Sequence, residues 1–75
     1  MKNQFANQKK LLALNVRELR LNRGLSQEAM ALEAEIDRTY ASQIERGVGN
    51  PSLKVICALA AVLQVHPDKL FAPKA

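Results

Sequence analysis

The stretch from residue 37 to residue 47, DRTYASQIERG, gathers long hydrogen-bonding side chains within two helical turns. Arg38, Thr39 and Tyr40 directly follow an aspartate, a residue type that commonly caps helices, and Gln43 comes one turn later. Arginine can donate two hydrogen bonds to O6 and N7 of guanine, and glutamine can form a similar pair with adenine. A helix that begins with these side chains is suited to reading base edges.

The charge of this 75-residue chain is unevenly distributed around that stretch, with a net value of +4. Residues 1–25 hold six basic residues against one acidic residue, and residues 38–54 hold three against one. Residues 26–37 hold four acidic residues and no basic residue. Positive charge therefore accompanies the candidate stretch, and a basic patch favours an anionic partner such as DNA.

Apolar residues recur at helical spacing along most of the chain, and no segment alternates with the period of a β-strand. Ser26, Asp37 and Ser52 are suited to cap three helices, and Gly24 is suited to end the first one. A proline at position 67 favours the start of a last short helix. The sequence thus predicts an all-α fold of five short helices. The expected inward-facing residues are Leu12, Val16, Leu19, Met30, Ala34, Ala41, Ile44, Ile56, Leu59, Ala60 and Leu63, and the last short helix carries Leu70 and Phe71.

The length predicts a single domain. We expect residues 1–10 to be a polar N-terminal extension, either frayed or helical, residues 11–72 to form the domain, and residues 73–75 to be a C-terminal tail. The apolar stretches are shorter than the about 20 residues of a membrane span, and no signal peptide is recognisable. We therefore expect a cytoplasmic protein with no membrane partner.

The sequence offers little for catalysis or for metal binding. The single cysteine, Cys57, cannot form an internal disulfide, and no paired Cys/His spacing indicates a metal site. There is one histidine, no glycine-rich phosphate loop and no catalytic pair of carboxylates. We expect a protein that is not an enzyme and that has no metal and no cofactor.

Only three residues, 35–37, separate the second expected helix from the third. Two short helices joined by so tight a turn are typical of the helix-turn-helix unit, whose second helix enters the major groove of DNA. That groove is about 12 Å wide and admits one helix. The methyl group of Thr39 and the ring of Tyr40 can then contact thymine methyl groups or the sugar-phosphate edge.

The segment of residues 19–65 resembles the lambda-repressor-like, or xenobiotic-response-element, helix-turn-helix family. The resemblance covers roughly residues 12–71. The residues that carry it are Leu25-Ser26-Gln27, Met30-Ala31, Ile44-Glu45-Arg46-Gly47, Pro51-Ser52-Leu53 and Leu59-Ala60.

The resemblance implies roles for individual residues. Gln27 matches a glutamine that binds a phosphate and supports the recognition helix. Arg20 and Glu45 match a partly buried ion pair between the first helix and the end of the third. The base-facing positions are Arg38, Thr39, Tyr40, Ser42 and Gln43, and the backbone-contacting positions are Arg46, Asn50 and Ser52.

Several of these residues have a second interpretation. Arg38 and Gln43 could be ordinary exposed polar residues, Thr39 could serve only as a secondary cap, and Tyr40 could cover the edge of the core. Arg46 could interact with the C-terminal end of the helix dipole instead of a phosphate.

Two residues depart from the family pattern. Glu35 stands in the turn where the family commonly has glycine, and a left-handed backbone there would cost a non-glycine residue roughly 1–2 kcal/mol. Ala41 is smaller than the usual branched residue, so the third helix is expected to lie closer to its neighbours.

Within the family, the short chain and its Asp-Arg-Thr-Tyr sequence are most similar to controller proteins of restriction-modification systems, which are compact dimers without an effector domain. We therefore expect a sequence-specific transcriptional regulator that binds double-stranded DNA as a homodimer on a (pseudo)palindromic operator. No small-molecule effector is expected. The expected dimer interface consists of Val55, Ala58, Val62, Leu70 and Phe71.

Two other classes of protein stay open at this point. An antitoxin-type interaction module with secondary DNA binding would normally need a further segment to wrap its partner. A nonspecific basic nucleoid protein would not need Arg38 and Gln43 at positions that can read bases. Neither the operator sequence nor the choice between activation and repression follows from the sequence.

Overall fold

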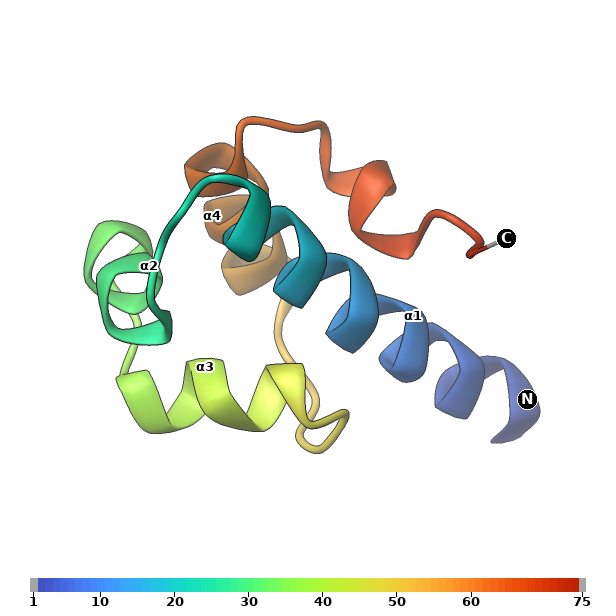
Figure 1. Cartoon of the computed structure of the whole chain (residues 1–75). Coiled ribbons are helices and arrows are strands. Elements are labelled where there is room, and N and C mark those ends of the chain that lie inside the picture. The colour runs from blue at the N-terminus through green and yellow to red at the C-terminus, as the bar shows by residue number, and fades with distance from the viewer. Residues whose placement is uncertain (1, 75) are drawn as a thin grey trace.

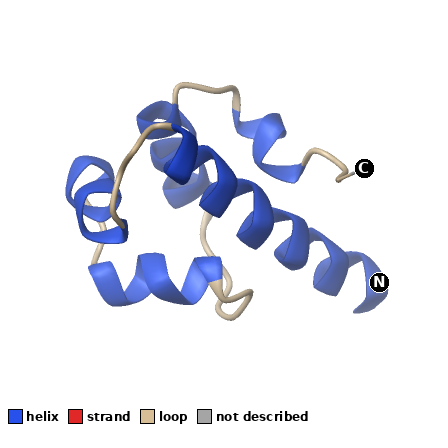
Figure 2. Ribbon diagram, in the orientation of Figure 1, coloured by secondary structure: helices blue, strands red, loops and turns tan. Residues whose placement is uncertain are grey.

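Four α-helices and one 3-10 helix make up residues 2–74, the part of the chain that the computed structural model describes (Figure 1). Loops join these helices, and the described range contains no strand, which confirms the all-α prediction (Figure 2). No helix in this range combines the length and the apolar character needed to cross a bilayer. The elements are α1 (Lys2–Asn22), α2 (Gln27–Ala34), α3 (Arg38–Glu45), α4 (Leu53–Leu63) and the 3-10 helix η1 (Pro67–Phe71).

The last element differs from the fifth α-helix that was predicted. Pro67–Phe71 forms a 3-10 helix, in which the backbone N–H of Lys69 donates to the carbonyl of His66 at 2.9 Å. Five residues are too few for a ladder of i→i−4 bonds, and 3-10 helices are usually this short. His66 is exposed and its side chain caps no backbone N–H.

The first helix begins earlier than the apolar pattern indicated. It runs without a break from Lys2 to Asn22, so the extension is helical rather than frayed. This continuity marks no boundary near residue 10, and the domain limits at residues 11 and 72 stay a prediction. The extension and the tail each include one residue, Met1 and Ala75 respectively, outside the described range.

The three predicted caps hold the short helices in place. The side chains of Ser26 and Ser52 accept hydrogen bonds from the backbone N–H of the third residue after each, at 3.0 and 3.2 Å. Asp37 accepts from the N–H of Thr39 at 2.7 Å. Gly24 has a φ of +68°, the left-handed conformation expected of a residue that ends a helix. Each cap satisfies a donor that the helix itself leaves unpaired.

The core lies where α1 crosses the other helices. In Figure 1, α1 runs diagonally across the molecule, α3 lies beneath it, α2 lies on the left and α4 lies behind. Two predicted core residues, Leu19 and Ile56, are only partly buried at its edge. The fully buried core consists of Leu12, Val16, Met30, Ala31, Ala34, Ala41, Ile44, Leu59, Ala60, Leu63 and Leu70.

A buried asparagine ties the C-terminal segment to α1. Asn15 is 6% exposed, and its side-chain amide donates to the carbonyls of Leu70 at 3.1 Å and Ala72 at 2.9 Å. Both amide hydrogens are therefore used in holding the chain beyond η1. Lys74 extends this attachment through an ion pair with Glu18 at 2.7 Å.

The turn between α2 and α3 has the left-handed geometry that makes Glu35 costly. Glu35 has φ 58° and ψ 42°, and its N–H reaches the carbonyls of Ala31 and Leu32. The N–H of Ile36 also donates to the carbonyl of Ala31, at 2.9 Å. These bonds satisfy the end of α2, and the side chain of Glu35 contributes none of them. The turn therefore has the conformation for which glycine is favoured.

Candidate nucleic-acid interface

The first turn of α3 presents hydrogen-bonding side chains to solvent. Arg38 and Thr39 are exposed, directly after the Asp37 cap. Together with Gln27 at the start of α2 and Ser42 on the next turn of α3, they line one open hollow of about 200 Å³. The structure thus brings four of the predicted DNA-contacting residues together where the two helices begin.

The other predicted contacts lie outside this hollow. Gln43 is half-buried, and a side chain at Gly49 would meet its Cβ at 3.9 Å, which places it beside the loop after α3. Arg46 is the exposed residue that ends α3, and Asn50 is exposed in the loop. Ser52 is exposed, although its hydroxyl already accepts the capping hydrogen bond of α4.

Tyr40 occupies an intermediate position. It is half-buried and packs against the core cluster. It does not line the hollow beside Arg38. This position agrees with the interpretation of Tyr40 as a residue that covers the edge of the core, and it leaves Arg38 and Thr39 as the leading side chains of α3.

An ion pair joins the C-terminal part of α1 to the C-terminal end of α3. The guanidinium of Arg20 contacts both carboxylate oxygens of Glu45, at 2.6 and 3.0 Å, and donates a third hydrogen bond to the carbonyl of Leu25 at 2.8 Å. The side chain of Glu45 is only 2% exposed. A charge buried this deeply needs its partner, because desolvation otherwise disfavours it strongly.

Gln27 links this ion pair to the hollow. Its Nε2 donates to Oε1 of Glu45 at 3.1 Å. An amide nitrogen carries two hydrogens, so the second remains for another acceptor such as a phosphate oxygen. Gln27 and Glu45 lie 18 positions apart, and no sequence spacing indicates this bond. The resemblance implied that Gln27 supports the recognition helix, but not that it does so through Glu45.

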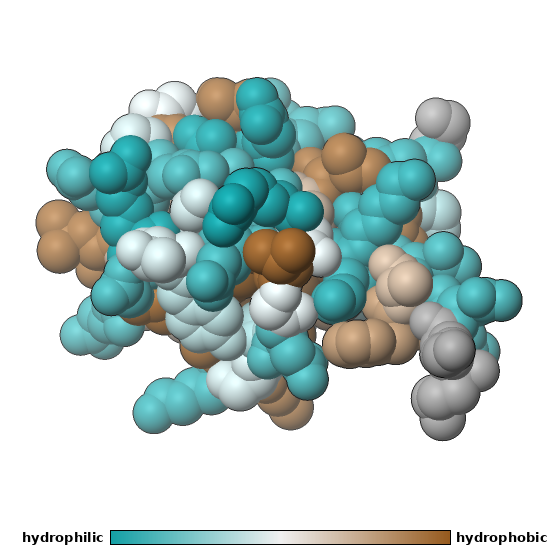
Figure 3. Space-filling view, turned by 90° about the horizontal axis from the view of Figure 1, so that it is seen from below, coloured by the Kyte–Doolittle hydropathy of each residue, from teal (hydrophilic) through white to brown (hydrophobic). Residues whose placement is uncertain are grey.

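The face of the molecule beneath α3 is mainly polar. Figure 3 views this face and shows hydrophilic surface broken by isolated apolar residues. Within residues 2–74, neither Arg38 nor Arg46 forms a salt bridge, whereas Arg20, Arg23 and Lys74 each have an acidic partner. The guanidinium groups of Arg38 and Arg46 are therefore available to form hydrogen bonds with a DNA phosphate or base.

The structure places the residues predicted for the dimer interface in different surroundings. Val55 and Ala58 line a hollow next to the α2–α3 turn, whereas Phe71 lines a different hollow with Phe5 of α1. Val62 is half-buried against the core. Leu70 is completely buried within its own chain, so it is a core residue and not an interface residue.

Metal binding finds no support in the geometry of the described residues. Within residues 2–74, no three side chains of the histidine, cysteine, aspartate or glutamate type come together. Cys57 is exposed on α4. The polar hollow at the start of α2 and α3 is instead suited to hydrogen bonding with an anionic surface.

The helix-turn-helix family model matches residues 16–70, which span α2, α3 and α4. The chain belongs to the helix-turn-helix family. It is lambda-repressor-like and related to restriction-modification controller proteins, within a family of DNA-binding transcriptional regulators rather than enzymes. The helix-turn-helix unit itself consists of α2, the turn at Glu35 and α3.

Two relatives are similar in sequence to most of this chain. The chain is 43% identical over 63 residues to a hypothetical transcription factor of Neisseria meningitidis, covering 84% of this chain and 59% of that protein. It is also 43% identical over 61 residues to the control protein C.BamHI of Bacillus amyloliquefaciens, covering 80% and 75% respectively. The chain therefore spans a little over half of the Neisseria protein.

Solved structures share the helix-turn-helix fold described above. The crystal structure of the Neisseria transcription factor superposes with a TM-score of 0.85 at 41% identity, covering 88% of this chain and 76% of that one. The restriction-modification controller protein C.AhdI from Aeromonas hydrophila superposes with a TM-score of 0.81 at 41% identity, covering 84% and 96%.

Proposed function

We propose that this helix-turn-helix regulator binds a specific (pseudo)palindromic operator as a homodimer and controls the genes of a restriction-modification system. The observation that carries the proposal is the grouping of Gln27, Arg38, Thr39 and Ser42 around one open hollow at the start of α2 and α3. This arrangement places a hydrogen-bond donor for a DNA phosphate beside hydrogen-bond donors that can read base edges. The relation to the control proteins C.BamHI and C.AhdI supports the regulatory context.

The two kinds of contact have separate jobs. Phosphate contacts fix the position of the protein on the duplex, and base contacts select the sequence. We assign base readout to Arg38, Thr39 and Gln43, and backbone contact to Gln27, Arg46, Asn50 and Ser52. Ser42 lines the hollow between the two groups.

A homodimer follows from the size of the binding surface. One recognition helix touches few base pairs, whereas two helices related by a two-fold axis read half-sites about 34 Å apart. We place the interface on the exposed side of α4 and the neighbouring Phe71. Leu53, at the start of α4, is 73% exposed and supplies a large apolar side chain there. The proposed protein acts in the cytoplasm, without a cofactor or a small-molecule effector.

Footprinting on the DNA upstream of the gene, repeated over a salt series, tests this function. The proposal expects two protected half-sites about one helical turn apart, with affinity that falls as salt rises. Weak, uniform protection of any DNA would indicate a nonspecific binder and contradict the proposal. Neighbouring methylase and endonuclease genes would support control of restriction and modification, whereas a neighbouring toxin gene would favour an antitoxin.

A further inference from the structure

Arg17 is an exposed arginine on α1 for which the sequence predicts no role. It lies between two points at which α1 is held against α3 and the loop that follows. Four residues earlier, Ala13 lies beside Gly47, where an added Cβ would come into ordinary van der Waals contact with the Ala13 Cβ at 4.0 Å. Three residues later, Arg20 binds Glu45. Because helix residues three and four apart are neighbours, Arg17 projects from the side of α1 near α3.

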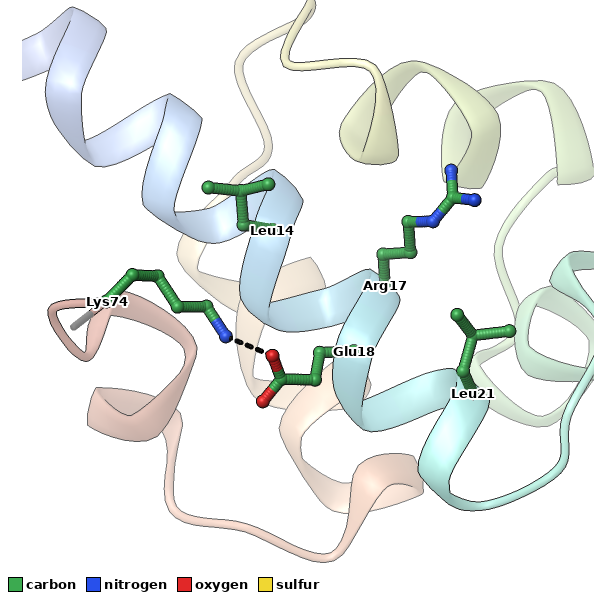
Figure 4. A pocket seen from close by; sticks show the side chains of 5 residues that line it. All are labelled: Leu14, Arg17, Glu18, Leu21 and Lys74. Carbon is green, nitrogen blue, oxygen red and sulfur yellow. Dashed lines mark hydrogen bonds and ion pairs between the residues drawn. The ribbon is translucent and has the colours of Figure 1, made fainter.

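The guanidinium of Arg17 is not neutralised by the acidic residue beside it. Within residues 2–74, Arg17 forms no salt bridge, and Glu18 is engaged by Lys74 at 2.7 Å. Figure 4 shows Glu18 and Lys74 facing each other, while Arg17 points away from them toward the region of α3. Arg17 thus resembles Arg38 and Arg46, the exposed arginines of α3 that also lack acidic partners.

We propose that Arg17 binds a phosphate of the DNA backbone beside the recognition helix. A guanidinium forms two parallel hydrogen bonds with a phosphate, and these charge-assisted bonds are strong and directional. The flanking contacts of Ala13 and Arg20 fix α1 on α3 and the loop after it, so this phosphate contact also fixes how α3 enters the groove. α1 then supplies a backbone contact in addition to those of α2 and the loop. The inference rests on the proposed function, because it requires α3 to lie in the groove.

A packing role for Arg17 makes a different prediction. Its aliphatic stem borders an apolar hollow of about 420 Å³ with Leu14 and Leu21 on α1, shown in Figure 4. Long charged side chains can cover apolar surface while their charge stays in water. Arg17→Met keeps an apolar stem and removes the charge, so it separates the two roles. Lys69→Met is the matched control, because Lys69 is an exposed cation on η1, at the opposite side of the molecule from α3 (Figure 1).

The experiment measures affinity for operator and scrambled duplexes over a salt series. One lost phosphate contact makes the negative slope of log K against log salt shallower by about 0.9, and it weakens binding by about tenfold at 0.1 M salt. We expect Arg17→Met to show both changes on both duplexes, Arg17→Lys to keep the wild-type slope, and Lys69→Met to keep it as well. An unchanged slope for Arg17→Met, or an equal change for Lys69→Met, overturns the inference.

Two further measurements keep this test independent of the proposed function and of stability. Arg38→Ala in the same series reports on the function: if it lowers the ratio of operator to scrambled affinity while Arg17→Met keeps the slope, only the Arg17 inference fails. If Arg38→Ala leaves that ratio unchanged, base readout by Arg38 fails. Phosphate ethylation interference supplies a positional readout, in which one ethylated phosphate weakens the wild type and has no effect on Arg17→Met. If the two proteins give the same interference pattern, Arg17 contacts no phosphate.

Discussion

The guanidinium of Arg20 holds both carboxylate oxygens of Glu45, with Nε 2.6 Å from Oε2 and Nη2 3.0 Å from Oε1. The same Oε1 also accepts a hydrogen bond from Gln27 at 3.1 Å. One buried carboxylate therefore connects α1, the start of α2 and the end of α3. The stability of the domain and the position of Gln27, the candidate hydrogen-bond donor to a DNA phosphate, therefore both depend on the Glu45 carboxylate.

Glu45→Ala is expected to destabilise the domain strongly. Removing one partner of a buried ion pair costs about 3–5 kcal/mol, because the remaining charge stays desolvated. The matched control is Glu18→Ala, which breaks an exposed pair with Lys74 and is expected to cost about 0–1 kcal/mol. Thermal unfolding of both variants checks this. A Glu45→Ala variant that melts within about a degree of the wild type would show that the ion pair contributes little.

Asn15→Ala is expected to loosen the C-terminal segment. The substitution leaves the carbonyls of Leu70 and Ala72 without their donor, and an unsatisfied buried polar group costs about 1–3 kcal/mol. Asn22→Ala is the control, because Asn22 is exposed at the end of α1. Amide hydrogen exchange should accelerate in residues 67–74 of Asn15→Ala and stay at the wild-type rate in the control. Equal exchange in both variants would mean that Asn15 does not hold this segment.

Glu35→Gly is expected to stabilise the protein by about 1 kcal/mol, since glycine adopts the left-handed conformation without steric cost. Glu33→Gly provides the opposite sign, because Glu33 lies inside α2, where glycine costs about 0.5–1 kcal/mol. In thermal unfolding, the Tm of Glu35→Gly should be about 4–8 °C higher than that of the wild type, and the Tm of Glu33→Gly should be lower. A decrease in Tm for both would show that the turn gains nothing from glycine.

The homodimer is expected to depend on Leu53. Leu53→Glu places a charge on the proposed α4 surface, and burying an unpaired charge opposes association. Leu32→Glu is the control, because Leu32 is 78% exposed on α2, outside that surface. Sedimentation equilibrium at tens of micromolar should detect dimers for the wild type and Leu32→Glu, and monomers for Leu53→Glu. A wild type that is only monomeric at that concentration would contradict the dimer.

The fold was largely predictable, because its signals are local. The caps at Ser26, Asp37 and Ser52 and the helical spacing of the apolar residues depend on neighbours a few positions apart. The 3-10 geometry of Pro67–Phe71 was missed, because a proline start and two apolar residues fit either kind of helix. The candidate site was predicted as a set of residues but not as an arrangement.

The rest depends on contacts between residues distant in the sequence. Leu70 is buried, and its carbonyl accepts a hydrogen bond from Asn15, 55 positions away, a contact that no local pattern reports. Likewise, Gln27 meets Glu45 only after α2 and α3 have packed. Periodicity identified the apolar face of each helix, but it could not decide whether an apolar residue faces its own core or a second chain.

The central claim is that the leading turn of α3 reads bases while its end contacts the backbone. Paired affinities of Arg38→Ala and Arg46→Ala on operator and scrambled duplexes, across a salt series, test it most directly. Arg38 is exposed on the first turn, so its loss should cost about 1–3 kcal/mol on the operator and much less on scrambled DNA. Arg46 lies at the C-terminal end of the helix, so its loss should weaken binding to both duplexes alike. It should also make the slope of log K against log salt shallower by about 0.9. If Arg38→Ala instead weakens both duplexes equally, Arg38 is a backbone contact and the account of base readout by this turn is wrong.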